Sequence, residues 1–176
     1  YIISSCTKDL RKKCSIPVMV SLMEPSEELV IAWLNQKGFF TLNNYRVGNK
    51  EIDLLAWNPI THEKQHVEIS VSVNPVGQFY GGRSISQAPS LNKRVKAYFE
   101  KKYKGTNDRT ANEVKKIFES DDYQKVLIIG LLNEDYDPFN KFQQEFAKHG
   151  VKVVNFKKVM EELTITKTRY TDARRY

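Results

Sequence analysis

Two acidic residues, Asp53 and Glu68, lie in sequence patterns that indicate a functional site. Asp53 lies inside the apolar run 52–56, and Glu68 lies in segment 66–73, which alternates polar and apolar residues. Strand side chains point to alternate faces, so Glu68 and Ser70 are expected side by side on the polar face. A buried carboxylate needs a cation or hydrogen-bond donors. The pattern indicates a site for a hard divalent cation; the alternative is ordinary acids at a solvated sheet edge.

The elements around these acids predict how they are brought together. A helix is expected from Pro25 to Gly38, with Glu27 and Glu28 in its first turn, where the helix dipole favours acids. Strands at about 51–57 and 66–73 close into a hairpin, because residues 58–63 form a turn-rich connection. Either glutamate is then a candidate third carboxylate for the site.

The rest of the chain alternates between helix and strand, which predicts an α/β fold with a mixed sheet flanked by helices. Residues 74–90 form a long loop rich in Gly, Pro and Ser. We expect one domain over 25–176 after an N-terminal extension, 1–24. The two later strands should be parallel through a βαβ crossover. The expected helices are 91–104, 110–119, 137–150 and a short final one at 158–163, and the expected strands are 126–131 and 151–156.

Composition and charge limit the partners. The 176 residues are 40% hydrophobic, which excludes a disordered chain, and the net charge of +7 favours a polyanion as partner. Segment 92–116 holds nine Lys or Arg against three acids, a local +6. The sequence has no run long enough for a membrane span and no signal-peptide core. Cys6 and Cys14 are expected to be free thiols in a reducing compartment, so we expect a cytoplasmic protein.

Taken together, the helix from Glu27 and the two acidic strands resemble the PD-(D/E)XK nuclease superfamily. The resemblance runs through Val73, and it implies a restriction-endonuclease-like αβββαβ core. The metal-binding acids of the family match Asp53 and Glu68, and its helical glutamate matches Glu27 or, less well, Glu28. The resemblance implies a metal-dependent endonuclease that hydrolyses phosphodiesters of DNA with Mg²⁺ or Mn²⁺. Resolvase-like members further imply a homodimer.

The sequence departs from the family at one catalytic position. The family lysine, two residues after the second acid, falls on Ser70, and a hydroxyl cannot supply positive charge. Lys64 shares the strand face of Glu68 but is four residues away, about 13 Å along a strand. Lys93 on the following basic helix is the better substitute. The basic residues expected to contact the nucleic-acid backbone are Lys93, Arg94, Lys96, Lys101 and Lys102.

Two other interpretations stay open at this point. The fold could be kept as a non-catalytic nucleic-acid-binding module with a degenerate site, and Ser70 in place of the lysine favours that interpretation. The chain could also be an α/β domain of a larger assembly whose basic edges meet a partner. A side-chain ammonium close to Asp53 and Glu68 would favour the enzyme over both.

Overall fold

The computed structural model describes residues 24–71, 90–130 and 137–172, and side chains are described through 71, over 90–130 and over 140–164. The expected extension 1–24 and the loop 74–90 lie outside the described residues except for their last residues. No helix in the described ranges is long and apolar enough to span a membrane.

One five-stranded mixed sheet forms the centre of the structure, with strand order β1-β2-β3-β4-β5. The first three strands are antiparallel neighbours, whereas β3, β4 and β5 run parallel. The predicted α/β class with a mixed sheet is confirmed, as is the parallel pairing of the last two strands. The strands are β1 (Phe40–Val47), β2 (Lys50–Trp57), β3 (Lys64–Ser70), β4 (Gln124–Ile129) and β5 (Val151–Asn155).

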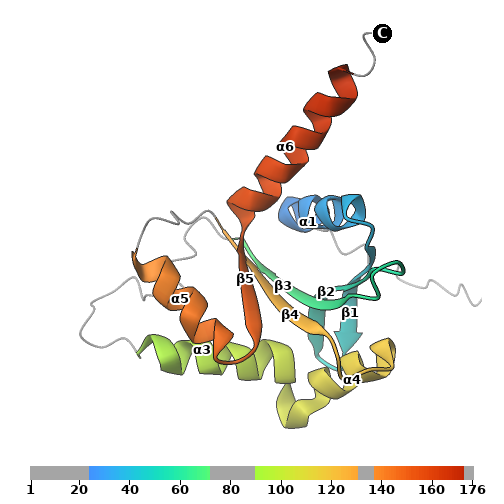
Figure 1. Cartoon of the computed structure of the whole chain (residues 1–176). Coiled ribbons are helices and arrows are strands. Elements are labelled where there is room, and N and C mark those ends of the chain that lie inside the picture. Colours follow the sequence, from blue (N-terminus) through green and yellow to red (C-terminus); the bar gives the residue numbers. More distant parts are fainter. Residues whose placement is uncertain (1–23, 72–89, 131–136, 173–176) are drawn as a thin grey trace, which may run out of the picture.

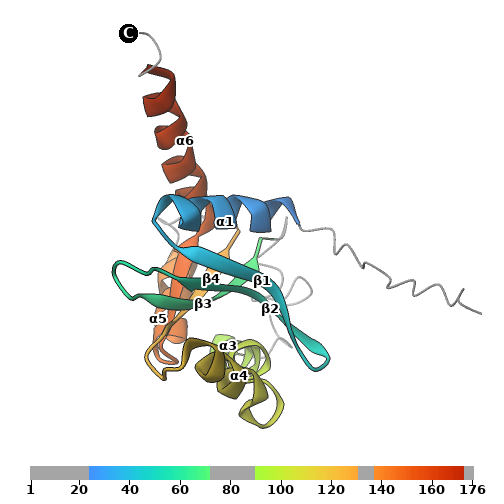
Figure 2. The ribbon, with the colours of Figure 1, turned by 90° about the vertical axis from the view of Figure 1, so that its right-hand side faces the viewer.

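Helices cover both faces of this sheet (Figure 1). On one side lie α1 (Pro25–Gln36) and α6 (Phe156–Asp172); Figure 2 shows α3 (Leu91–Phe99) and α4 (Arg109–Phe118) on the other, together with α5 (Asp137–Ala147). The prediction of a short final helix at 158–163 is wrong, because α6 continues to Asp172 and projects away from the sheet. Within the part of α6 whose side chains are described, Phe156, Val159 and Leu163 pack against the sheet cluster.

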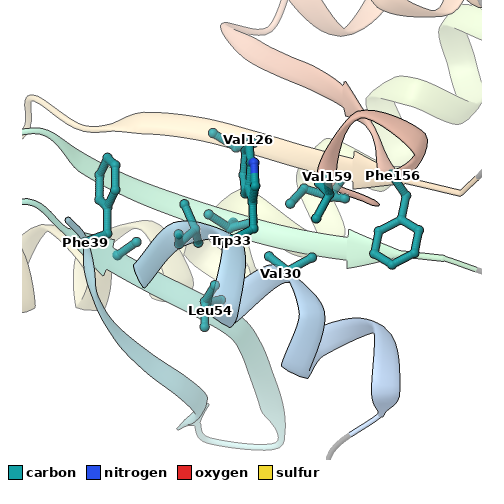
Figure 3. Packing of buried hydrophobic residues seen from close by; sticks show 11 residues of the cluster. Val30, Trp33, Phe39, Leu54, Val126, Phe156 and Val159 are labelled. Atoms are coloured by element: carbon teal, nitrogen blue, oxygen red, sulfur yellow. The ribbon is translucent and has the colours of Figure 1, made fainter. Parts of the chain in front are cut away.

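A hydrophobic cluster holds α1 and α6 on the sheet (Figure 3). Val30 and Trp33 of α1 pack with Leu54 of β2 and Val159 of α6. The Trp33 indole N–H also donates a 2.7 Å hydrogen bond to Glu162 of α6. Burial of large apolar side chains is the main stabilising contribution here. The cluster therefore sets where the first turn of α1, with its two glutamates, lies relative to β2.

The helix predicted at 91–104 changes its winding at residue 100. After α3 the chain forms a π-helical turn, η1 (Glu100–Lys104), closed by a 2.9 Å hydrogen bond from the Gly105 amide to the Glu100 carbonyl. The fully buried Tyr103 donates from its hydroxyl to the Val126 carbonyl at 2.7 Å, which anchors the turn on β4. π-Turns concentrate at functional sites. This one carries Lys102 and places the Tyr103 side chain against β4.

We predict that Gly105→Ala destabilises the fold more than Gly150→Ala. Both glycines have positive φ, 75° and 69°, which costs an alanine at least about 1 kcal/mol, and the ψ of 177° at Gly105 is one that essentially only glycine adopts. A Cβ at Gly105 would lie 2.3 Å from Thr110 Oγ1, whereas a Cβ at Gly150 meets nothing within 4 Å. The overlap adds about 1–3 kcal/mol at Gly105 alone. Urea unfolding of both variants measures the difference, and equal losses would contradict the close packing of η1 against α4.

Candidate functional site

The ladder of β2 is interrupted at Asp53. Pairing with β1 skips the position of Asp53 and Asn44, where Asn44 has a left-handed φ of 52°, and pairing with β3 stops at Leu54 and Val67. In place of a backbone carbonyl, the Asp53 Oδ2 accepts the Ile69 amide at 2.8 Å. The carboxylate is therefore part of the sheet's hydrogen bonding, and its direction is set by the backbone of β3.

The interruption also changes which faces the side chains take. Ile52 and Leu55 would point to opposite faces of a regular strand, yet both pack in one cluster with Val114 and Phe118 of α4. The strand thus bends around Asp53. This bend separates β2 from β3 and leaves Asp53 Oδ1 facing η1, where it contacts Lys102.

Glu68 lies on β3 and is fully buried, as is His66 on the same face. The expected polar face of β3 is therefore not solvated in this part of the strand, because α3, η1 and β4 enclose it. The alternative interpretation of Glu68 as an ordinary acid at a solvated edge is wrong. A buried glutamate requires a partner for its charge.

That partner is Lys102, which projects from η1 between the two acids. Its Nζ lies 3.2 Å from Asp53 Oδ1 and 2.5 Å from Glu68 Oε2. An ammonium thus lies between the two acids, and it comes from the expected basic segment 91–104 but from a different residue than Lys93. Lys93, the substitute expected from the sequence, is exposed on α3 and lies nine residues earlier, about 13 Å along a helix.

The electrostatics of the three groups follow from burial and mutual contact. Burial and then the charge of Glu68 raise the pKa of Asp53 to about 6, against the opposing effects of Lys102 and the Ile69 amide. Burial likewise raises the pKa of Glu68, although Lys102 counteracts it. Burial would lower the pKa of Lys102, but the two carboxylates outweigh it and the pKa is raised. The ammonium stays charged, while the Asp53 carboxyl, with its pKa of about 6, lies close to proton exchange at neutral pH.

His66 is the residue of this site that the sequence did not identify. Its Nε2 lies 3.1 Å from Glu68 Oε1, and burial lowers the pKa of the imidazole to about 3, so the ring is neutral. An ionised carboxylate only accepts, so the ring donates its Nε2–H to Glu68. The available signal was the alternation of β3, which puts residues 66 and 68 on one face.

The other predicted catalytic residues are placed less closely. Glu27 is partly buried in the first turn of α1, and burial followed by the charge of Asp53 raises its pKa. Glu28 is exposed. Ser70 is partly buried at the end of β3, and its carbonyl accepts the Gly130 amide at 3.1 Å. Among the described residues no three acids or histidines form a metal-binding group, so neither glutamate completes a three-ligand site.

The expected nucleic-acid contacts divide into two sets. Lys93, Lys96 and Lys101 are exposed along α3 and η1, and Arg94 is partly buried. Lys102 was expected among them, but its ammonium contacts Asp53 and Glu68 instead. Regular helical spacing explains this difference, because residue 102 follows Val95 by seven positions and Tyr98 by four, which puts it on the sheet-facing side of the segment.

A divalent cation fits the donors of this site. One oxygen of Asp53 and one of Glu68 converge on a single cationic atom, and the buried Glu68 Oε2 has the ammonium beside it but no aligned hydrogen bond. Both donors are hard carboxylate oxygens. Mg²⁺ commonly binds through one or two carboxylates and completes its shell with water and substrate phosphate. Asp53 and Glu68 therefore suit Mg²⁺ or Mn²⁺.

An apolar cavity of about 570 Å³ lies away from these acids. It opens between the ends of β1 and β2 and the end of α4, and its lining includes Phe40, Leu42, Trp57 and Phe118. It contains neither Asp53 nor Glu68. The candidate site is therefore identified by its ionisable side chains and not by the cavity.

Comparisons of the chain with protein-family models, with curated proteins and with solved structures find no match. What the site can do therefore follows from its own geometry and chemistry. The restriction-endonuclease-like core, the activity and the homodimer that the sequence resemblance implies stay predictions.

We predict that Lys102→Met destabilises the protein by about 3 kcal/mol at neutral pH, because it leaves Glu68 as an unpaired buried charge. Burial keeps the pKa of Glu68 above its ordinary value of 4.5, so the penalty shrinks as the pH falls toward 4.5 and the acid is protonated. The neighbouring exposed Lys101→Met is the matched control, with a change under about 0.5 kcal/mol. Urea unfolding at several pH values measures both. Equal effects of the two variants would contradict the ion pair.

The Asp53 carboxyl should titrate near pH 6 in the metal-free protein, against an ordinary value of 3.8. An acid with a raised folded-state pKa stabilises the fold below its unfolded pKa and loses that contribution as the pH rises through the folded value. The contribution of Asp53 to the free energy of unfolding thus falls between about pH 4 and 6. Carboxyl ¹³C NMR gives the pKa, and Asp53→Asn should lack this part of the pH dependence. Titration below pH 4 would refute the burial argument.

Proposed function

We propose that this protein is a metal-dependent endonuclease that hydrolyses phosphodiester bonds of DNA. The observation that carries the proposal is the contact of one ammonium, from Lys102, with both candidate metal ligands. A phosphoryl-transfer site needs carboxylates to hold a cation and a further positive charge for the developing phosphate charge. Asp53, Glu68 and Lys102 supply these groups in one place.

The order of elements supports a PD-(D/E)XK assignment. A helix precedes three antiparallel strands, and helices then lead to a strand parallel to the third, which matches an αβββαβ core. Asp53 lies in the second strand where its ladder opens, and Glu68 lies in the third. We therefore assign the two acids the roles of the family's metal-binding pair. Lys102 takes the role of the motif lysine, whose position in the sequence is occupied by Ser70.

Each residue then has a distinct role. Asp53 and Glu68 would bind Mg²⁺ or Mn²⁺, which supplies Lewis-acid activation of the phosphate and a more acidic water. Lys102 orients the attacking water and stabilises negative charge on the phosphate oxygens. Glu27 is close enough to Asp53 for their charges to interact, so it is our candidate for orienting a water molecule or accepting its proton.

The charge distribution suits a DNA substrate. Exposed Lys93, Lys96 and Lys101 lie on the continuous helical segment that also carries Lys102, so phosphate contacts along it would lead toward the acids. Clustered cations displace counterions from a nucleic-acid backbone, and this makes the affinity depend steeply on salt. A non-catalytic binding module would share that dependence. It would not need the Lys102 contact.

We predict that the protein nicks or cuts DNA in the presence of Mg²⁺ or Mn²⁺ and that Asp53→Ala has no detectable activity. Lys102→Met should slow cleavage about a hundredfold, the usual effect of losing one group that stabilises transition-state charge. Lys157→Met, which changes an exposed lysine on α6, should cleave at the wild-type rate. Single-turnover cleavage of supercoiled plasmid, with folding checked by circular dichroism, measures all four proteins.

Two results would count against this function. Equal cleavage by wild type and Asp53→Ala would mean that the activity comes from a contaminant and that the site is wrongly assigned. Salt-sensitive DNA binding by the wild type without cleavage in either metal would favour the binding module.

A further inference from the structure

A buried histidine lies directly behind the proposed metal ligand Glu68. His66 has no exposed surface, and its Nε2 is 3.1 Å from Glu68 Oε1. The other ring nitrogen, Nδ1, is buried without a hydrogen-bond partner. An unpaired buried nitrogen costs stability, which an apolar side chain of similar size would avoid. Core packing alone therefore does not explain a histidine here, whereas its donor to Glu68 does.

The donor decides which Glu68 oxygen is available. With Oε1 held by His66, the carboxylate cannot rotate freely, and Oε2 faces Lys102 at 2.5 Å. An apolar residue at position 66 would release that rotation and leave Oε1 without a donor. Oε2 is the Glu68 oxygen that faces the cation position. The hydrogen bond from His66 to the other oxygen, Oε1, therefore sets the direction of Oε2.

The same ring also contacts the turn that carries the ammonium. The His66 and Tyr103 rings meet edge to face, with centroids 4.9 Å apart and an interplanar angle of 60°. Tyr103 neighbours Lys102 in η1, and its hydroxyl anchors η1 to β4. His66 is therefore packed between the acid and the turn, so it holds Glu68 in place relative to the backbone of η1.

We infer that His66 is a positioning residue for the proposed metal site: its Nε2–H orients Glu68 so that Oε2 faces the cation. This inference rests on the proposed function and deepens it. His66 contacts neither metal nor substrate and acts only through Glu68. Hydrogen-bond partners of metal ligands commonly change metal affinity or activity by about 10–100-fold when removed.

The test compares Mn²⁺ binding by the intact protein, measured by calorimetry, with Mn²⁺-dependent cleavage. His66→Leu should weaken Mn²⁺ binding about 10–100-fold and raise the Mn²⁺ concentration for half-maximal cleavage equally. His66→Gln keeps an N–H donor and should recover most of that loss. His62→Asn, in an exposed turn, is the matched control and should bind as the wild type does. Metal-free DNA affinity should be unchanged in all of them.

A second measurement keeps the test decisive if His66→Leu fails to fold. In the wild type, ¹⁵N NMR should show the Nε2–H tautomer, and its resonance should shift on titration with Mg²⁺. The opposite tautomer, or a resonance that Mg²⁺ saturation leaves unmoved, would overturn the inference.

The outcomes separate the inference from the proposed function. Equal Mn²⁺ affinity of the folded His66→Leu variant and the wild type overturns the inference, even if the wild type cleaves DNA. Mn²⁺ binding that depends on His66, without cleavage, supports the inference and overturns the nuclease. No Mn²⁺ binding by the wild type overturns both.

Discussion

The shared contact of Lys102 with Asp53 and Glu68 is the interaction on which the site depends. Two ionised carboxylates are costly to bury beside each other without a cation, and the complete burial of Glu68 is offset by an ammonium 2.5 Å from it. Lys102 is still partly exposed, with 28% of its side-chain surface accessible. The Lys102 and Asp53 side chains therefore reach the surface, while Glu68 behind them does not.

The surrounding fold serves to keep this contact in place. The break in the β2 ladder aims Asp53 at η1, and Tyr103 anchors η1 to β4. His66 occupies the space between Glu68 and Tyr103. Together these features hold Asp53 in an environment that raises its pKa to about 6. A carboxylate that served only a stabilising ion pair would have a lowered pKa, because the folded state would then favour its charged form. Perturbed groups of this kind are typical of functional sites.

Much of the fold could be predicted from the sequence, but the key contact could not. The apolar run at 126–129 and the alternation at 66–70 identify strands because both patterns depend on local spacing. The same alternation correctly puts Glu68 on the polar face of β3, but it does not show that this face is buried. The burial depends on α3 and η1, which are distant in sequence. Lys102 was expected to contact nucleic acid, although helical spacing from Val95 and Tyr98 puts residue 102 on the apolar face of its segment. That spacing does not show which groups lie opposite residue 102, because Asp53 and Glu68 belong to strands distant in sequence, so only the structure identified the contact.

The most direct test of the central claim is anomalous diffraction from crystals soaked in Mn²⁺. We predict a peak within coordination distance of Asp53 Oδ1 and Glu68 Oε2, with the Lys102 ammonium moved from its position between them. Carboxylates that converge on a replaceable cation require this result. An ammonium still bridging both acids, with no peak beside them at a Mn²⁺ concentration that saturates binding in solution, would contradict the account and leave the cluster a structural ion pair.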